Sequence, residues 1–143
     1  MRIMALDYGD ARTGIAVSDE SQTLTGDAWV ENNKNINEVA QKLIREAALR
    51  DVSCIVVGHP KNMDGSVGQR AKKSESFAEH LRSLCDIEVV LWDERMTTKS
   101  ANRILTDTGT FGKKRKKTID AVAASLILES YLSFVKSNKV FNG

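Results

Sequence analysis

The chain has 143 residues, of which 28% are charged and 41% hydrophobic, and its formal net charge is +2. This composition argues against a disordered or fibrous chain and predicts one domain with its own core over residues 1–143. No apolar run approaches the roughly 18 residues of a membrane-spanning helix, so we expect no membrane partner.

The cysteines and the first residues bear on the cellular compartment. Cys54 and Cys85 stand apart, each in or beside an apolar stretch, which favours two buried free thiols over a disulfide. Asp7 and Asp10 interrupt the stretch where a signal peptide would be apolar. We therefore expect a cytoplasmic protein.

The first candidate site residue follows an apolar stretch at residues 3–6. Asp7 comes directly after this stretch, and a second apolar stretch at residues 14–17 leads back. This pattern predicts a β-hairpin whose first strand is central in a sheet. A carboxylate at the end of such a strand needs compensation, either from a metal ion or from hydrogen bonds to turn amides.

After the hairpin, one more strand is predicted, followed by alternating helices and strands. Asn35 with Glu38, and Ser66 with Gln69, have the spacing of capping boxes and predict two helix starts. The predicted elements are a strand at 23–31, a helix closed by Asp51, a strand at 54–57, a loop at 58–65, a helix to residue 84, a strand at 87–92, a helix from Thr97 or Thr98 to Gly109, and a last helix at 118–135 with a frayed tail at 136–143.

The connections between these elements predict the sheet. Tight turns should make the first three strands antiparallel, and helical crossovers should make the later strands parallel to the first. The expected fold is therefore α/β, with a mixed five-stranded sheet and helices on both faces. Ligands of such sheets bind beyond the carboxyl ends of the parallel strands.

Acidic residues fall at this edge of the predicted sheet. Asp7 ends the first strand, Asp93 and Glu94 end the last strand, and Asp120 lies in the first turn of the last helix. Carboxylates from separate elements predict a site for one or two Mg²⁺ or Mn²⁺ ions. Adjacent strand residues point to opposite faces, so we favour the longer Glu94 as ligand and keep Asp93 as the alternative. Asp120 has a second interpretation, in which it only complements the helix dipole.

Four motifs in order make the sequence similar to the YqgF (RuvX) family of RNase H-like nucleases. The motifs span residues 2–132 and are Asp7-x-Gly9-x-x-Arg12-x-Gly14-x-Ala16-Val17-Ser18-Asp19, Val57-Gly58-x-Pro60-x-Asn62-Met63-Asp64-Gly65-Ser66, Trp92-Asp93-Glu94-Arg95-x-Thr97-Thr98 and Ile119-Asp120-x-x-Ala123-Ala124-x-x-Ile127-Leu128. The resemblance implies an RNase H-like fold and a nuclease that matures the 5′ end of pre-16S ribosomal RNA, with ribosomal particles as further partners. It also implies that Asp7, Glu94 and Asp120 are the catalytic, metal-binding carboxylates.

Two other functions remain open at this point. One is a Holliday junction resolvase-like DNA endonuclease, and the other is a non-catalytic nucleic-acid-binding factor in ribosome assembly. Actin-like ATPases also open with Asp-x-Gly turns, but they duplicate the domain, which occurs once in this sequence. We expect a monomer, although the sequence does not define the oligomeric state.

A basic run shortly before Asp120 is the candidate nucleic-acid contact. It consists of Lys113, Lys114, Arg115, Lys116 and Lys117. Phosphate binding is its functional interpretation and a solvated loop the alternative, while Arg12 and Arg95 could extend the surface. Aromatic residues make up 6% of the chain and form no stacking motif, which favours recognition of the backbone. His59 is interpreted as a loop residue and His80 as a solvated helix residue.

Overall fold

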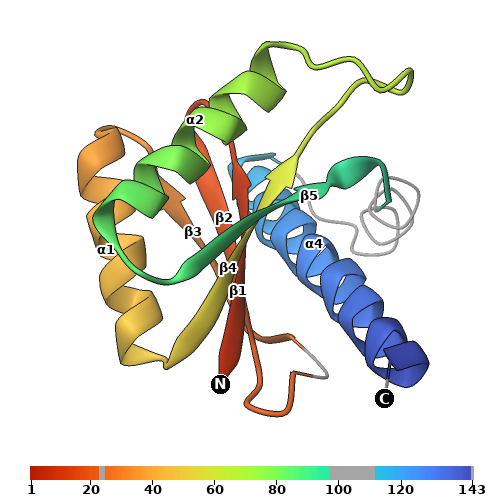
Figure 1. The fold of residues 1–143 in the computed structure, drawn as a ribbon. Helices are drawn as coiled ribbons and strands as arrows, with labels where there is room; N and C mark the ends of the chain where they lie inside the picture. Colours follow the sequence, from red (N-terminus) through yellow and green to blue (C-terminus); the bar gives the residue numbers. More distant parts are fainter. Residues whose placement is uncertain (23–24, 97–111, 143) are drawn as a thin grey trace.

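The computed structural model describes residues 1–22, 25–96 and 112–142 (Figure 1). Within these residues the elements are β1 (Arg2–Tyr8), β2 (Arg12–Ser18), β3 (Thr25–Asn32), α1 (Ile36–Leu49), β4 (Val52–His59), α2 (Gln69–Leu84), β5 (Glu88–Asp93), the 3-10 turn η1 (Glu94–Met96) and α4 (Gly112–Asn142). The helix predicted from Thr97 or Thr98 to Gly109 lies outside the described residues. None of the described helices has a segment long and apolar enough to cross a membrane.

One sheet with the strand order β3-β2-β1-β4-β5 forms the centre of the fold. The strand β2 pairs antiparallel with both β1 and β3, whereas β4 pairs parallel with β1 and β5. The helices α1 and α2 cover one face of the sheet and α4 covers the other (Figure 1). The predicted mixed sheet with helices on both faces is confirmed.

The two faces of the sheet alternate residue by residue along the central strands, as the pleat requires. The side chains that pack toward α1 and α2 are Met4, Leu6, Ile15, Val17, Ile55 and Val57. The side chains that pack toward α4 are Ile3, Ala5, Ala16, Cys54 and Val56. Strands β1 and β4 are therefore buried on both faces, which explains their continuous apolar sequence.

Of the two predicted capping boxes, one N-cap is present and the other is wrong. The side chain of Asn35 accepts hydrogen bonds from the amides of Asn37 and Glu38, and it caps α1 as predicted. Ser66 instead donates its hydroxyl and its amide to the Asp64 carboxylate. The Asp64 side chain thus forms a local turn with Ser66, and α2 begins after Gly68 with no side-chain cap.

Helix α4 is longer than the sequence pattern predicted. It begins at Gly112, six residues before the expected start at 118, and it continues past residue 135 to Asn142. Lysine and arginine are good helix formers, so a run of them is compatible with a helix as well as with a solvated loop. The basic run at 113–117 therefore belongs to the first turns of α4.

The two cysteines are free thiols, as expected, but they differ in burial. Cys54 is buried in β4, whereas Cys85 is half-buried at the end of α2. Burial raises the pKa of the Cys54 thiol to about 11, so this group stays protonated and unreactive at neutral pH.

Candidate active site

Asp7, Glu94 and Asp120 interact at the carboxyl ends of the parallel strands. Asp7 is the next-to-last residue of β1 and has the same parity as Ile3 and Ala5, which face α4. Glu94 opens η1 directly after β5, and Asp120 lies on α4. Three elements that are far apart in the sequence thus bring carboxyl groups to one edge of the sheet.

The carboxyl groups of Asp7 and Glu94 form a hydrogen-bonded pair. Loss of water around them raises the pKa of both groups, and their mutual repulsion acts in the same direction on Glu94, whose pKa rises to about 8. The charge of Asp120 raises the pKa of Asp7 further. In the metal-free protein at neutral pH, the pair therefore retains a proton.

Two arginines supply positive charge to this cluster. Arg70, at the start of α2, lowers the pKa of both Asp7 and Glu94, although less than burial raises them. Arg12 donates its Nε–H to Asp120 Oδ2 at 2.9 Å. Arg12 comes from β2, so this ion pair ties the first turns of α4 to the hairpin beside Asp7.

Asp93 has a different environment from its neighbour Glu94. It accepts hydrogen bonds from the backbone amide of Arg95 at 3.0 Å and from Arg95 Nη2 at 2.6 Å. These hydrogen bonds lower the pKa of the Asp93 carboxyl. The strand ends at Asp93, and the turn that follows brings Glu94 to Asp7 while Asp93 stays with Arg95.

Gly58 provides the space that Glu94 occupies. A Cβ atom on Gly58 would lie 2.9 Å from Glu94 Cδ and 2.7 Å from Ile127 Cδ1. Only a residue without a side chain lets Glu94 lie against β4 in this way. The sequence pattern does not predict this role of Gly58, although the residue stands inside the second motif.

Both histidines differ from their interpretation in the sequence. His59 is the last residue of β4 and is buried, with its Nε2 atom 2.9 Å from Glu75 Oε1, so it is a strand residue and not a loop residue. His80 is half-buried and lines a pocket with Tyr8 and Phe77. Its helical position suggested solvent exposure, but α2 turns this side of the helix toward α1 and the sheet.

The residues predicted to bind nucleic acid are two paired arginines, Arg12 and Arg95, and the basic run at the start of α4. Arg12 and Arg95 are each paired with a carboxylate, Asp120 and Asp93 respectively. The basic run at 113–117 precedes Asp120 on α4 by about one helical turn. The basic run is therefore close in sequence to Asp120 on the same helix.

The carboxylates have the right chemistry for a hard cation, but they are not arranged as a ligand set. Among the side chains that the structure describes, no group of three or more Asp, Glu, His or Cys residues could hold a metal ion. Asp120 is paired with Arg12, and the raised pKa values of Asp7 and Glu94 favour protonation of that pair. Carboxylate oxygens are the ligands that Mg²⁺ and Mn²⁺ prefer, so the chemistry of Asp7, Glu94 and Asp120 suits such a cation.

Comparisons with known proteins identify the family of the chain. The family model described as "RuvX: Holliday junction resolvase" matches residues 1–134. A Halothermothrix orenii protein named "Putative pre-16S rRNA nuclease" is 44% identical over 137 residues, covering 94% of this chain and 96% of that protein. A Shouchella clausii protein of the same name is 42% identical over 138 residues, covering 92% and 94%.

A solved structure has the same fold at low sequence identity. "T. thermophilus RuvC in complex with Holliday junction substrate" aligns with a TM-score of 0.63 and 8% identity, covering 94% of this chain and 96% of that chain. This likeness concerns the fold alone, which is the RuvC-like RNase H fold. The match of the family model over nearly the whole chain confirms the resemblance seen in the motifs, and the chain belongs to the RuvX family.

Proposed function

We propose that this protein is a metal-dependent nuclease that hydrolyses a phosphodiester bond during maturation of the 5′ end of pre-16S ribosomal RNA. The name of relatives that are 42 to 44% identical over almost their full length supports this choice of substrate. The chemistry rests on one observation above all, the hydrogen-bonded pair of Asp7 and Glu94 beside Asp120.

In this proposal Asp7, Glu94 and Asp120 are the catalytic carboxylates and would hold Mg²⁺ or Mn²⁺. When bound, such a cation supplies an activated water and neutralises charge on the phosphate. Asp7 and Glu94 must then lose the proton that they share, and Asp120 must turn from Arg12 toward them. Until Asp120 turns, Arg12 holds it in position.

The basic residues serve substrate binding in this account. Residues 113–117 contact the phosphate backbone close to the carboxylates, and Arg95 extends this contact on the side of β5. Arg70 attracts the phosphate to Asp7 and Glu94, because its charge already acts on both groups. Ribosomal RNA precursor, free or within ribosomal particles, is the partner that fits such contacts.

Cleavage of a four-way DNA junction is the second candidate function. The description of the matching family favours it, since it reads "Holliday junction resolvase". The same carboxylates and the same cation would act in either reaction, because both hydrolyse a phosphodiester bond. The two functions therefore differ in the substrate and not in the chemistry of the site.

Cleavage assays on two substrates test the proposal. The first substrate is an RNA with the 5′ precursor segment of 16S ribosomal RNA, and the second is a four-way DNA junction, each with Mg²⁺, Mn²⁺ or EDTA. We expect cleavage of the RNA by wild type with either metal, and none in EDTA or with Asp7→Asn. Cleavage of the junction alone would favour the resolvase. Binding of RNA without cleavage of either substrate would indicate a non-catalytic assembly factor.

A further inference from the structure

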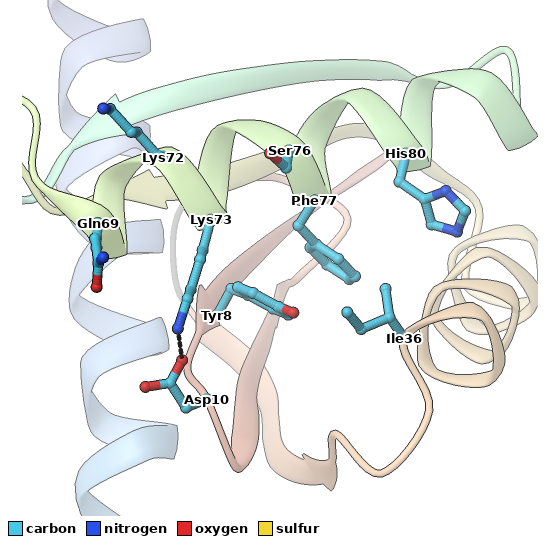
Figure 2. A pocket seen from close by; sticks show the side chains of 9 residues that line it. All are labelled: Tyr8, Asp10, Ile36, Gln69, Lys72, Lys73, Ser76, Phe77 and His80. Atoms are coloured by element: carbon cyan, nitrogen blue, oxygen red, sulfur yellow. Dashed lines mark hydrogen bonds and ion pairs between the residues drawn. The ribbon is translucent and has the colours of Figure 1, made fainter.

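A second feature lies on the opposite face of the sheet from the carboxylates. It is a pocket of about 700 Å³ between α2, the end of β1 and the start of α1 (Figure 2). This volume is within the range of small-molecule binding sites. Tyr8, which lines the pocket, directly follows Asp7, and its side chain points to α2 because neighbouring strand residues alternate.

One end of this pocket is aromatic and apolar. The ring of Tyr8 stacks on the ring of Phe77, with centroids 4.3 Å apart and planes 12° apart. Figure 2 shows these two rings, the imidazole of His80 and the side chain of Ile36 directed into the same space. Ile36 is 50% exposed, although it is a large apolar residue at the first position of α1. Such an environment suits a flat aromatic group.

His80 places a polar atom in the same space. Its Nε2 atom is shielded from solvent and forms no hydrogen bond with any residue that the structure describes. A shielded polar atom without a partner is unfavourable, and a ligand in the pocket can supply one. The edge of a nucleobase carries both donors and acceptors, so it can satisfy this nitrogen in either tautomer.

The other end of the pocket is polar and leads toward the carboxylates. Lys73 Nζ lies 2.7 Å from Asp10 Oδ1 in an ion pair that is largely exposed. Such pairs contribute little stability, so Lys73 can exchange Asp10 for a phosphate. Arg70 lies three residues before Lys73 on α2, and its charge acts on Asp10 as well as on Asp7 and Glu94.

We propose that this pocket binds one nucleotide of the substrate strand, a few positions from the bond that is cleaved. The base enters between Tyr8, Ile36 and His80, and its phosphate reaches Lys73. This inference rests on the proposed function, because it assigns a subsite to the same substrate. A strand is the occupant, and not a free nucleotide, since Tyr8 in the pocket directly follows Asp7 of the candidate active site, so one strand can reach both.

Abasic RNAs test whether the pocket holds a base. Binding of a single-stranded RNA is measured by fluorescence anisotropy in EDTA, for the intact RNA and for RNAs with one abasic position each. We expect one abasic position to weaken binding to wild type about tenfold, the effect of losing one stacked base. His80→Ala should weaken binding of intact RNA by a similar factor and remove the response to that position. Gln41→Ala, on an exposed part of α1, should behave as wild type.

The ion pair gives a second test that does not depend on His80. Lys73→Gln should weaken RNA binding, whereas Asp10→Asn should strengthen it, because the aspartate competes with phosphate for the same lysine. If the pair served only to stabilise the fold, both changes would weaken binding or neither would change it. Opposite signs would show that phosphates of the bound strand lie near Lys73 and Asp10.

Three outcomes would overturn the proposal. The first is that each abasic position changes the RNA affinity of His80→Ala by the same factor as it changes the affinity of wild type. The second is binding of adenosine monophosphate that depends on His80 without any abasic effect, which would assign the pocket to a free nucleotide. The third is that no RNA binds. Cleavage of the intact RNA with Mg²⁺ tests the nuclease separately, and Asp7→Asn is its control. Cleavage without an abasic effect would reject only the pocket proposal. An abasic effect without cleavage would reject only the nuclease proposal.

Discussion

At the scale of single residues, the pair of Asp7 and Glu94 links protonation to stability. A carboxyl group whose pKa is higher in the folded than in the unfolded protein binds more protons when folded, so the unfolding free energy falls as pH rises between the two values. For Glu94 this interval runs from its ordinary value of 4.5 to about 8. The contribution of the Glu94 carboxyl to the unfolding free energy is fully present below pH 4.5 and is lost above pH 8.

Replacing Glu94 by Gln should therefore flatten the pH dependence of stability. In EDTA, wild type should lose on the order of 1 kcal/mol of unfolding free energy for each pH unit across this interval, and the variant clearly less. Urea unfolding between pH 5 and pH 8 measures the difference, with Glu129→Gln on the exposed side of α4 as the control. Equal slopes for wild type and Glu94→Gln would show that the pair holds no proton.

Gly58 should matter more for catalysis than for stability. In Gly58→Ala, the new Cβ atom meets the outer atoms of the Glu94 and Ile127 side chains, and both can move. We expect an unfolding free energy within about 1 kcal/mol of wild type, but a cleavage rate at least about tenfold lower because Glu94 is displaced. Urea unfolding and single-turnover cleavage, run on the same preparation, separate the two effects. An unchanged rate would mean that the position of Glu94 is not critical.

At the scale of elements, the contact of α4 with β2 depends on Gly14. A Cβ atom at this position would lie 2.1 Å from the backbone oxygen of Asp120. Backbone atoms cannot move aside as a side chain does, so a larger residue must push the helix from the sheet. The absence of a side chain at Gly14 therefore sets how close Asp120 comes to Asp7.

Gly14→Ala should lower both stability and activity. We expect a loss of about 1 to 3 kcal/mol in unfolding free energy, as for other overpacked sites, together with loss of cleavage. Gly26→Ala is the matched control, since its Cβ would meet no atom closer than 3.4 Å. Chemical denaturation of the two variants measures the contrast, and equal stability would contradict the close packing of α4 on β2.

The elements also show where sequence patterns suffice and where they fail. Apolar runs and connection lengths predicted the strands and their directions, because the strands follow from local periodicity and the directions from the kind of connection between them. The predicted start of α4 was wrong, because a basic run at 113–117 is compatible with both a helix and a loop. The capping box at Ser66 failed because Ser66 donates its amide and its hydroxyl to Asp64, two residues earlier, and does not cap the helix.

At the scale of the whole molecule, the site combines residues that local patterns cannot relate. The order of the elements predicted that Asp7, Glu94 and Asp120 would share one edge. It did not predict that Arg12 pairs with Asp120 or that Gly58 makes room for Glu94, since these contacts depend on how the elements pack. The pocket at Tyr8 was not predicted for the same reason, because its side chains come from three separate elements.

The net charge of the molecule is small, so nucleic-acid binding should depend on where the charge lies. Replacing Lys113, Lys114, Lys116 and Lys117 by Gln should weaken binding to all single strands alike. The log-log slope of affinity against salt should also become shallower by about 0.7 for each phosphate contact that is lost. Lys136→Gln, an exposed site far along α4, is the control for a single lost charge. An unchanged slope would mean that the basic run does not touch phosphate.

The central claim is that Glu94, with Asp7 and Asp120, holds the cation of a nuclease, and its neighbour Asp93 offers the sharpest comparison. The measurement is the Mn²⁺ dependence of pre-16S rRNA cleavage by wild type, Glu94→Gln and Asp93→Asn. We predict that Asp93→Asn cleaves with nearly the Mn²⁺ dependence of wild type, because Asp93 is engaged by Arg95. Glu94→Gln should not cleave at any Mn²⁺ concentration. Full cleavage by Glu94→Gln together with none by Asp93→Asn would contradict the account.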